Sequence, residues 1–594
     1  MTEFQNKPYT INIGTDDFKE MATGNDLFVD QTSFIFTLLG GGFKVTLITR
    51  PRRWGKTLNM TMLQYFFGIP VKSNGEIDEE ERSKRLDIFS QLKIGKHADL
   101  LQKYLGKFPV IFVSFKEIKG EVYETIEMKV RELIYGLYST HEYLLYSDKL
   151  SEWQKDLFKK FMTKSFDLAE LETSLFHLSK MLSTHFGQKV FILIDEYDTP
   201  LNDWYALQLA RETTSPAEET YFKSVLNLFR GIFSKTLKGN DFLEKGVVTG
   251  ILRVAKANLF SGVNNFGEDS ILDEDYAEHF GFTETEVNTL LHKSNIDKNP
   301  ETARALKSWY NGYNIGGLTI YNPWSIMNCI QNRGKFKAYW VGTASTALIE
   351  QALVLDKFQS EIQTLIEGGS VDMIADPKMV FADIKSSPNA LYNLLLFSGY
   401  LTAIKAKLAM DGITYLCSVK IPNYEVRGVF MTSTAAWIEN KFKTDARAYR
   451  TFVTDLLKGD VPKFIETLQS YLDVSASYFD SGPKQGEILY NGFMWGLFAS
   501  SVNEDYFVEK ERESGLGRAD LLIIPKETGP FPFALILEYK IANKTEDLQV
   551  VAQSALDQIE AKEYISKIKA YKNVEKVIRV GLAFSGKEVA VAFK

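Results

Sequence analysis

The sequence predicts a multidomain α/β protein, and three observations support that prediction. The chain has 594 residues, which is enough for about three or four domains. Two apolar runs, 44–49 and 190–194, are each followed by a polar segment, as expected at the carboxyl end of a buried parallel strand. Strand-like and helix-like segments alternate through the first half, which indicates a doubly wound parallel sheet. We therefore expect residues 1–276 to form this sheet, 277–480 a mostly helical region and 481–594 a second α/β domain.

The composition favours an intracellular protein that does not cross a membrane. The net charge is −7, so the chain as a whole has no basic field to attract nucleic acid, and any such site must be local. The two cysteines, Cys329 and Cys417, are too few for a disulfide framework and suit a reducing cytoplasm. The sequence has no signal-like N-terminus and no apolar run of about eighteen residues. We expect a cytoplasmic protein.

Strands are expected where short β-branched apolar runs occur, and helices where apolar residues recur with the helical period. In the first half these are strand 44–49, helix 58–67, strand 108–115, helix 123–138, helical residues 150–186, strand 190–194, helix 218–237 and strand 246–250. In the middle region they are helices 283–291, 300–310, 324–331 and 390–402, a strand at 415–419 and a helical linker at 434–472. A helical lid of the winged-helix type would fit this order.

The segment between the first strand and the first helix reads RPRRWGKT and predicts a phosphate-binding loop. A helix that begins at Gly55, Lys56 and Thr57 presents unpaired backbone N–H groups to an anion. Lys56 can reach the β- and γ-phosphates of ATP, and the Thr57 hydroxyl can ligate Mg²⁺. Arg50 stands where such loops usually begin with glycine, so this loop must turn differently. Arg50 and Arg53 are candidate nucleotide contacts. The pair Arg52 and Arg53 could bind phosphates, nucleic acid or a neighbouring acidic surface, and a plain solvated turn would explain the pair equally well.

A second motif supports nucleotide binding. Strand 190–194 is followed by Asp195 and Glu196, and a carboxylate at this end of a central strand is where phosphate-loop enzymes hold Mg²⁺. We expect Asp195 to take that role and Glu196 to polarise an attacking water. If strand 246–250 lies between the two motif strands, Thr249 would be near the γ-phosphate; otherwise it is an ordinary strand-end hydroxyl. ATP binding is better supported than ATP hydrolysis.

A different set of polar residues lies on the strands expected near the C-terminus. Asp520 lies on one strand, and Glu538 and Lys540 lie two residues apart on the next, so the latter two side chains share one face. Asp520 and Glu538 would hold one or two Mg²⁺ ions that lower the pKa of a bound water, and Lys540 would orient that water. Glu487 and Gln558 could complete the site from neighbouring helices. A cross-strand ion pair would explain the same residues. The elements expected here are helix 488–500, strands 506–513, 518–524 and 533–539, and helix 548–568.

Both ends of the chain resemble known families. The N-terminal half resembles the AAA-ATPase-like domain of many bacterial proteins, through FVDQT at 28–32, RPRRWGKT at 50–57, DEYD at 195–198, TGI at 249–251 and FSGVNN at 260–265. WYNGY at 309–313 and YNPWS at 321–325 are similar to the segments that usually follow. The C-terminal part resembles the PD-(D/E)XK nuclease superfamily, through ESGLGRAD at 513–520, EYK at 538–540 and ALDQI at 555–559. The RPRR form is itself characteristic of the first family.

The resemblance implies an ATPase core of the ASCE or AAA type, joined to a Mg²⁺-dependent nuclease with a restriction-endonuclease-like fold. The expected function is ATP binding and hydrolysis that regulates or drives cleavage of nucleic acid, DNA in the first place, in defence or mobile-element biology. The chain could assemble as a homo-oligomer. The alternative is a nucleotide-switched regulator that binds nucleic acid or protein through an inactive nuclease fold. A signalling ATPase scaffold is a third reading, and it predicts no affinity for nucleic acid.

Overall fold

The computed structural model divides the chain into two compact units. Unit 1 comprises Met1–Leu348 and Asp372–Val426, and unit 2 comprises Ile349–Val371 and Arg427–Lys594. Residues 277–480, expected as one region, are thus shared between the two units. The structure describes residues 11–594 except 25, 202–215, 253–264, 297–299, 341–348, 350–360, 363, 367, 378–387, 443–445, 475–505, 510–520, 528, 544, 562–567, 569–570 and 587.

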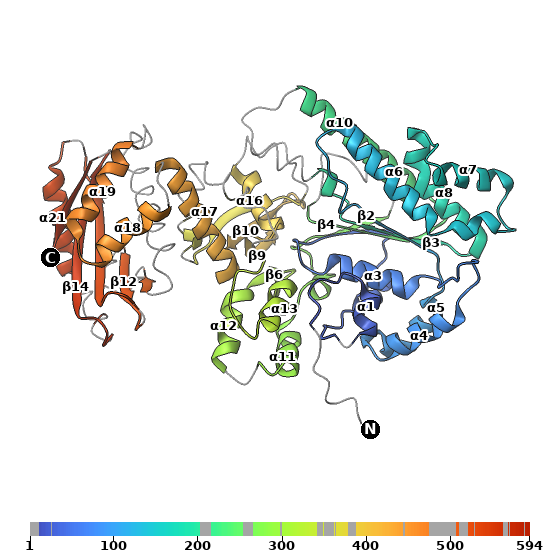
Figure 1. Cartoon of the computed structure of the whole chain (residues 1–594), viewed down its shortest axis with the longest axis horizontal. Helices are drawn as coiled ribbons and strands as arrows, with labels where there is room; N and C mark the ends of the chain where they lie inside the picture. The colour runs from blue at the N-terminus through green and yellow to red at the C-terminus, as the bar shows by residue number, and fades with distance from the viewer. Residues whose placement is uncertain are drawn as a thin grey trace. The chain divides into compact units, whose positions relative to one another are not determined.

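Unit 1 is built around a five-stranded parallel sheet (Figure 1). The strands are β1 (Val45–Thr49), β2 (Val110–Ser114), β3 (Val190–Asp195), β4 (Leu243–Gly250) and β5 (Phe266–Asp269). Their order in space is β2-β3-β4-β1-β5, and each neighbouring pair is parallel. The doubly wound parallel sheet predicted from the sequence is therefore confirmed. Because β4 lies between β1 and β3, Thr249 is in the position that its predicted role requires.

Helices cover both faces of this sheet (Figure 1). One face packs against α6 (Tyr123–Ser139), α8 (Leu168–Phe186) and α10 (Pro216–Leu237), with α7 (Glu152–Met162) packed on α6. The other face packs against α2 (Ser33–Gly40), α3 (Lys56–Phe67) and α5 (Ala98–Tyr104), with α1 (Phe18–Thr23) and α4 (Glu79–Ser90) packed on α3. Strands β1 and β3 are buried at every position, which is why their sequences are mostly apolar.

The helical stretch expected at 150–186 is two helices, because the chain contains two start signals. Ser151 and Gln154 form a capping box at the start of α7. Asp167 and Glu170 form another at the start of α8, where the Asp167 carboxylate accepts from the Glu170 N–H. Each box satisfies backbone N–H groups that the first turn of a helix leaves unpaired. A break between the two helices is therefore encoded locally.

The rest of unit 1 combines helices with two small sheets. The helices are α11 (Glu284–Lys293), α12 (Pro300–Tyr310), α13 (Pro323–Gln331), α16 (Pro388–Phe397) and the start of α17 (Tyr424–Phe442). One sheet is the hairpin of β6 (Tyr313–Ile315) and β7 (Leu318–Ile320). The other contains β8 (Val371–Ala375), β9 (Thr402–Leu408) and β10 (Tyr415–Lys420) in the order β8-β10-β9.

The helix expected at 390–402 ends earlier than the apolar pattern suggested. Helix α16 stops at Phe397, and β9 already begins at Thr402. Between them Gly399 adopts φ +90°, a conformation that an L-residue rarely takes and that ends the helix. The winged-helix lid and the expected domain boundaries stay predictions.

Unit 2 contains a mixed five-stranded sheet. Its strands, β11 (Tyr506–Glu509), β12 (Leu521–Pro525), β13 (Phe533–Ile541), β14 (Lys576–Ser585) and β15 (Glu588–Phe593), lie in chain order. Only β13 and β14 are parallel, and α21 (Leu548–Ala561) connects the chain between them. Helix α21 packs on one face, and the turn between α18 (Ala446–Leu457) and α19 (Val461–Val474) contacts Ile578 on the other. This arrangement is consistent with the C-terminal α/β domain predicted from the sequence.

Candidate functional site

The predicted phosphate loop joins the end of β1 to the first turn of α3. Gly55 is the N-cap of α3 and has φ +75°, and a Cβ there would meet nothing within 4 Å. No side chain caps this helix end. The backbone N–H groups of its first turn are therefore available to an anion, as expected at a helix N-terminus that binds phosphate.

Three polar side chains meet where β3, β4 and α3 converge. The Thr57 hydroxyl donates to Asp195 Oδ2 at 2.8 Å, and the Thr249 hydroxyl donates to Asp195 Oδ1 at 2.5 Å. Asp195 is fully buried. Burial raises its pKa, and the hydrogen bonds from Thr249 and Thr57 oppose that shift. The structure thus brings Asp195 together with Thr57, which lies 138 positions away in the sequence, and with Thr249, which lies 54 positions away. A hydroxyl beside a carboxylate is a ligand set that suits a hard divalent cation such as Mg²⁺.

Lys56 lies against the loop that precedes it. Its ammonium group donates to the carbonyl oxygens of Arg50 and Pro51 at 3.0 and 2.8 Å. Burial lowers the pKa of Lys56, and the nearby carboxylates of Glu196 and Asp195 oppose that shift. The lysine is therefore held inside the curve of the loop by backbone dipoles, on the side where phosphate would bind.

A cavity of about 530 Å³ opens next to this loop. Residues 52–57 form one side, and Glu196 and Lys116 contribute charged groups. Glu196 adopts φ +51° and accepts a hydrogen bond from the Thr199 hydroxyl at 3.3 Å. Apolar side chains also line the cavity; they are Phe18, Leu27, Phe28, Val29, Met62, Phe282 and Met327.

Arg50 has a structural position and does not line this cavity. Its guanidinium is fully buried and forms an ion pair with Asp269 on β5, with Arg50 Nη2 2.5 Å from Asp269 Oδ1. Arg50 also donates to the Thr49 carbonyl at 2.9 Å and lies 5.4 Å from the centre of the Phe280 ring. Because its hydrogen-bonding groups face the protein interior, this geometry corrects the expectation that the Arg50 side chain contacts nucleotide. Arg53, by contrast, lines the cavity.

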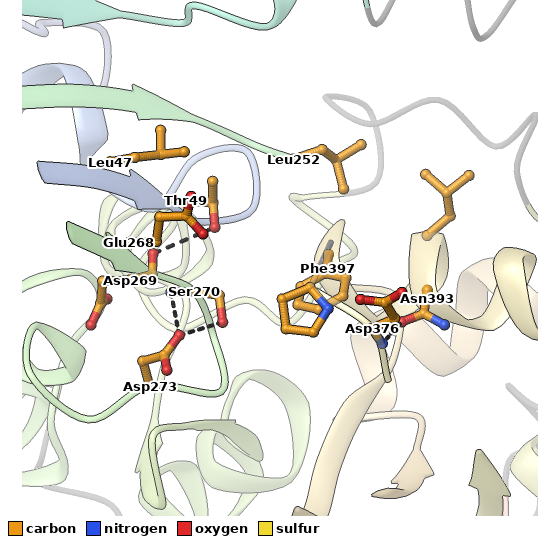
Figure 2. Close-up of a pocket in the computed structure, with 12 residues that line it drawn as sticks. Leu47, Thr49, Leu252, Glu268, Asp269, Ser270, Asp273, Asp376, Asn393 and Phe397 are labelled. Carbon is orange, nitrogen blue, oxygen red and sulfur yellow. Dashed lines mark hydrogen bonds between the residues drawn. The ribbon is translucent and has the colours of Figure 1, made fainter. Parts of the chain in front are cut away.

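A smaller cavity of about 70 Å³ lies at the ends of β1 and β5 (Figure 2). Figure 2 shows Glu268, Asp269 and Asp273 on one side and Asp376 with Asn393 on the other. The Asp273 carboxylate accepts from the Ser270 N–H and hydroxyl at 2.8 and 2.7 Å. The predicted phosphate loop lines the larger of these two cavities and not the smaller one, so the larger is the candidate nucleotide site.

In unit 2, the predicted Glu-x-Lys pair lies at the end of the central strand β13. Glu538 is buried and accepts a hydrogen bond from the Gln558 side-chain amide on α21. Lys540 donates to the Ser554 hydroxyl at 2.9 Å. Both side chains therefore lie on one face of β13, as the two-residue spacing predicted, and the structure shows that this face is the one covered by α21. Glu487 and Asp520 lie outside the described residues, and within those residues no group of three metal-ligating side chains occurs.

Sequence reasoning missed two carboxylates that organise the nucleotide site. Asp198 accepts from the backbone N–H groups of Ile251 and Leu252, each at 2.9 Å, and so ties the end of β4 to the end of β3. Asp269 neutralises Arg50 from β5, a strand the sequence did not reveal. The acidic run 195–198 contained a signal for Asp198. No local signal indicated Asp269.

Comparison with known proteins defines the class of each part. Residues 12–260 match an AAA-ATPase-like family described as predicted AAA-ATPase, and residues 485–594 match the PD-(D/E)XK nuclease superfamily. The chain therefore contains an AAA-ATPase-like domain in its N-terminal part and a PD-(D/E)XK superfamily domain at its C-terminal end. Both family assignments expected from the sequence are confirmed. Domains of these two classes generally use a nucleotide and a divalent metal.

A curated relative extends over nearly the whole chain. It is described as an uncharacterized protein in the vnfD 5′ region of Azotobacter chroococcum mcd 1. It is 22% identical over 592 residues, which cover 96% of this chain and 96% of the relative. No solved structure matches the chain. Among the described residues, no helix has both the length and the apolar character that a membrane crossing requires.

Proposed function

We propose that unit 1 binds and hydrolyses ATP with Mg²⁺, and that this reaction regulates or drives a metal-dependent nuclease in unit 2. The observation that carries the first half is the Thr57–Asp195 hydrogen bond at 2.8 Å, at the N-terminus of α3. The cavity beside it is lined by both charged and apolar side chains, as expected of a pocket that binds a nucleotide.

Each residue of this site has a distinct task in the proposed reaction. Thr57 and Asp195 would hold the metal ion, which neutralises charge on the phosphates when bound. Lys56 supplies a positive charge to the β- and γ-phosphates from within the curve of the loop. Glu196 faces the same cavity and would orient the attacking water. Thr249 keeps the Asp195 carboxylate in a fixed orientation through its 2.5 Å hydrogen bond.

The nuclease proposal rests on the end of β13 and on the family match. Glu538 and Asp520 would hold Mg²⁺, which supplies an activated water when bound. Gln558 fixes the orientation of the Glu538 carboxylate by donating to it. Lys540, held by Ser554, would orient the water or balance charge on the phosphate. Glu487 is a candidate third carboxylate. The proposed substrate is nucleic acid, DNA in the first place, in defence or mobile-element biology, and the proposed location is the cytoplasm.

Nucleotide binding is tested by titrating purified full-length protein with a fluorescent ATP analogue in Mg²⁺, followed by an assay of phosphate release. Lys56→Ala and Thr57→Ala should each weaken binding or abolish release. Lys72→Ala is the matched control, because Lys72 is exposed and lies on a surface turn. Wild-type protein that binds no nucleotide would contradict this part of the proposal.

Cleavage is tested with plasmid, single-stranded DNA and RNA in Mg²⁺, with and without ATP. Lys540→Ala should abolish cleavage, while Lys572→Ala, at an exposed position, should leave it unchanged. A response to ATP that is lost in Lys56→Ala would show that the two activities are coupled. Well-folded protein that binds nucleic acid without cutting it would favour a nucleotide-switched regulator. Protein with no affinity for nucleic acid would favour a signalling ATPase scaffold.

A further inference from the structure

Four consecutive residues of the phosphate loop are each contacted by a later part of unit 1. Three of these contacts are made by aromatic side chains. Trp340 donates from Nε1 to the Arg52 carbonyl at 3.1 Å. The Arg53 guanidinium carbon lies 4.1 Å from the centre of the Trp324 ring. Trp54 meets the Tyr313 ring edge-on, with the ring centres 4.9 Å apart. The fourth is the packing of Gly399 beside Pro51, where a Cβ, which glycine lacks, would lie only 2.9 Å from Pro51 Cβ.

The loop needs this external support because its own sequence does not favour its shape. Arg53 adopts φ +67°, a left-handed conformation that costs a non-glycine residue roughly 1–2 kcal/mol. Phosphate loops usually turn on glycines, which adopt such angles freely. In this chain the segment 51–54 has no glycine. The contacts that surround the segment therefore have to hold the strained turn in place.

Trp340 is itself held by a buried carboxylate. Its backbone N–H donates to Glu425 Oε1 at 2.6 Å, and the Ser325 hydroxyl donates to Glu425 Oε2 at 2.6 Å. Both Trp340 and Glu425 are fully buried, and Tyr400 packs edge-on against the Trp340 ring. Burial raises the pKa of Glu425 to about 7, against the opposing effect of its hydrogen bonds. Burying a carboxylate lowers the stability of the fold unless hydrogen bonds compensate. The hydrogen bonds from Trp340 and Ser325 provide that compensation for Glu425.

We propose that Trp340 and Glu425 are positioning residues for the nucleotide site: Glu425 orients Trp340, and Trp340 holds the Arg52 carbonyl so that the loop keeps its phosphate-binding turn. This inference rests on the proposed nucleotide binding. The energetic coupling between nucleotide binding and these loop contacts is reciprocal by thermodynamic necessity. A ligand that fixes the loop therefore also stabilises the contacts that hold the loop in shape. Glu425 is in the first turn of α17, and nucleotide binding should therefore stabilise that turn.

The test compares nucleotide affinity with amide hydrogen exchange in the first turn of α17. In wild-type protein, a non-hydrolysable ATP analogue with Mg²⁺ should slow exchange at residues 424–430. Trp340→Phe keeps a large ring but loses the donor to Arg52, so affinity should fall about tenfold, as expected for a buried hydrogen bond. The protection of residues 424–430 by the analogue should fall with it. Trp153→Phe is the matched control, because Trp153 is exposed on α7.

A conservative rescue separates positioning from general damage. Glu425→Ala removes both acceptors and should behave as Trp340→Phe does, whereas Glu425→Gln can still accept from Trp340 and should retain most of the affinity. Ser325→Ala is the mild variant, expected to fold normally and to weaken binding severalfold. Variants that fold and bind nucleotide as tightly as wild type, with unchanged protection, would overturn the inference while leaving nucleotide binding intact. Wild-type protein that binds no nucleotide would refute the proposed function itself, and the inference with it.

Discussion

Replacing Arg50 with methionine should destabilise unit 1 without removing any contact to nucleotide. Arg50→Met removes the guanidinium but keeps much of the side-chain volume, and it leaves the buried Asp269 carboxylate without its counter-charge. In the native protein burial already raises the pKa of Asp269 from 3.8 to about 6, although Arg50 opposes the shift. At about 1.4 kcal/mol per pKa unit, burying the ionised carboxylate costs about 3 kcal/mol even with Arg50 present.

The loss expected on removing one member of a buried ion pair is about 3–5 kcal/mol at neutral pH. The loss should depend on pH. Because the folded pKa of Asp269 lies above its unfolded value, the protonated carboxyl favours folding at low pH, and this contribution is lost as pH rises from about 3.8 to about 6. Arg50→Met should raise the folded pKa further, so its effect should be smaller at pH 5 than at pH 7.5.

The assay is urea unfolding of unit 1 at the two pH values, followed by tryptophan fluorescence, together with nucleotide affinity measured on folded protein. Arg50→Met/Asp269→Leu removes both charges and should recover much of the lost stability. Asp269→Leu alone completes the double-mutant cycle, and we expect a coupling free energy of about 2–3 kcal/mol. A fall in nucleotide affinity with an unchanged unfolding midpoint would refute this reasoning and make Arg50 a phosphate ligand.

Three further predictions follow from single positions. Burial raises the pKa of Glu425 from 4.5 to about 7, so the free energy of unfolding of the wild-type protein should fall by about 3 kcal/mol as pH rises through that interval. Glu425→Gln should make the free energy of unfolding less dependent on pH. Equal pH dependence in the variant and the wild type would contradict this. Gly399→Ala places a Cβ 2.9 Å from Pro51 Cβ at φ +90° and should weaken nucleotide binding about fivefold in a fluorescence titration. Unchanged affinity would count against the inference that contacts from later parts of unit 1 hold the loop in shape. Gly581→Ala places a Cβ 2.4 Å from the Leu556 nitrogen and should destabilise unit 2 by about 1–3 kcal/mol in urea unfolding, with nucleotide affinity preserved. An unshifted unit 2 transition would show that α21 and β14 can separate at little cost.

Several features of unit 1 were predictable because their signals are local. The strands β1 and β3 are apolar runs bounded by polar loops, and the helix after Gly55 begins where a phosphate loop requires. The expected role of Thr249 depended on a condition, that its strand lies between β1 and β3. The sequence pattern could not show this, because strand order is a property of the assembled sheet. The sheet meets the condition, and the role of Thr249 near the γ-phosphate stays a prediction.

Other features had no local signal. The four-residue strand β5 and the strand β9 were not recognised, because each is short or mostly exposed and lacks a strong apolar pattern. The partner of Arg50 lies 219 residues away in sequence, and the partner of the Arg52 carbonyl 288 residues away. No window of sequence spans such distances. Arg50 therefore looked like a ligand contact, and Glu425 and Trp340 did not stand out.

The sequence by itself determined the class of each domain through the motifs that resemble known families, the apolar runs of β1 and β3 with the polar residues that follow them, and the shared face of Glu538 and Lys540. These depend on residue types at short spacings, through backbone geometry and the two-residue period of a strand. The tertiary structure alone decided which charged side chains support the fold and which face the cavity. The role of a charged side chain depends on its burial and on its partners from distant segments. A guanidinium that faces a cavity can bind a ligand, whereas one that is buried beside a carboxylate forms an ion pair that supports the fold.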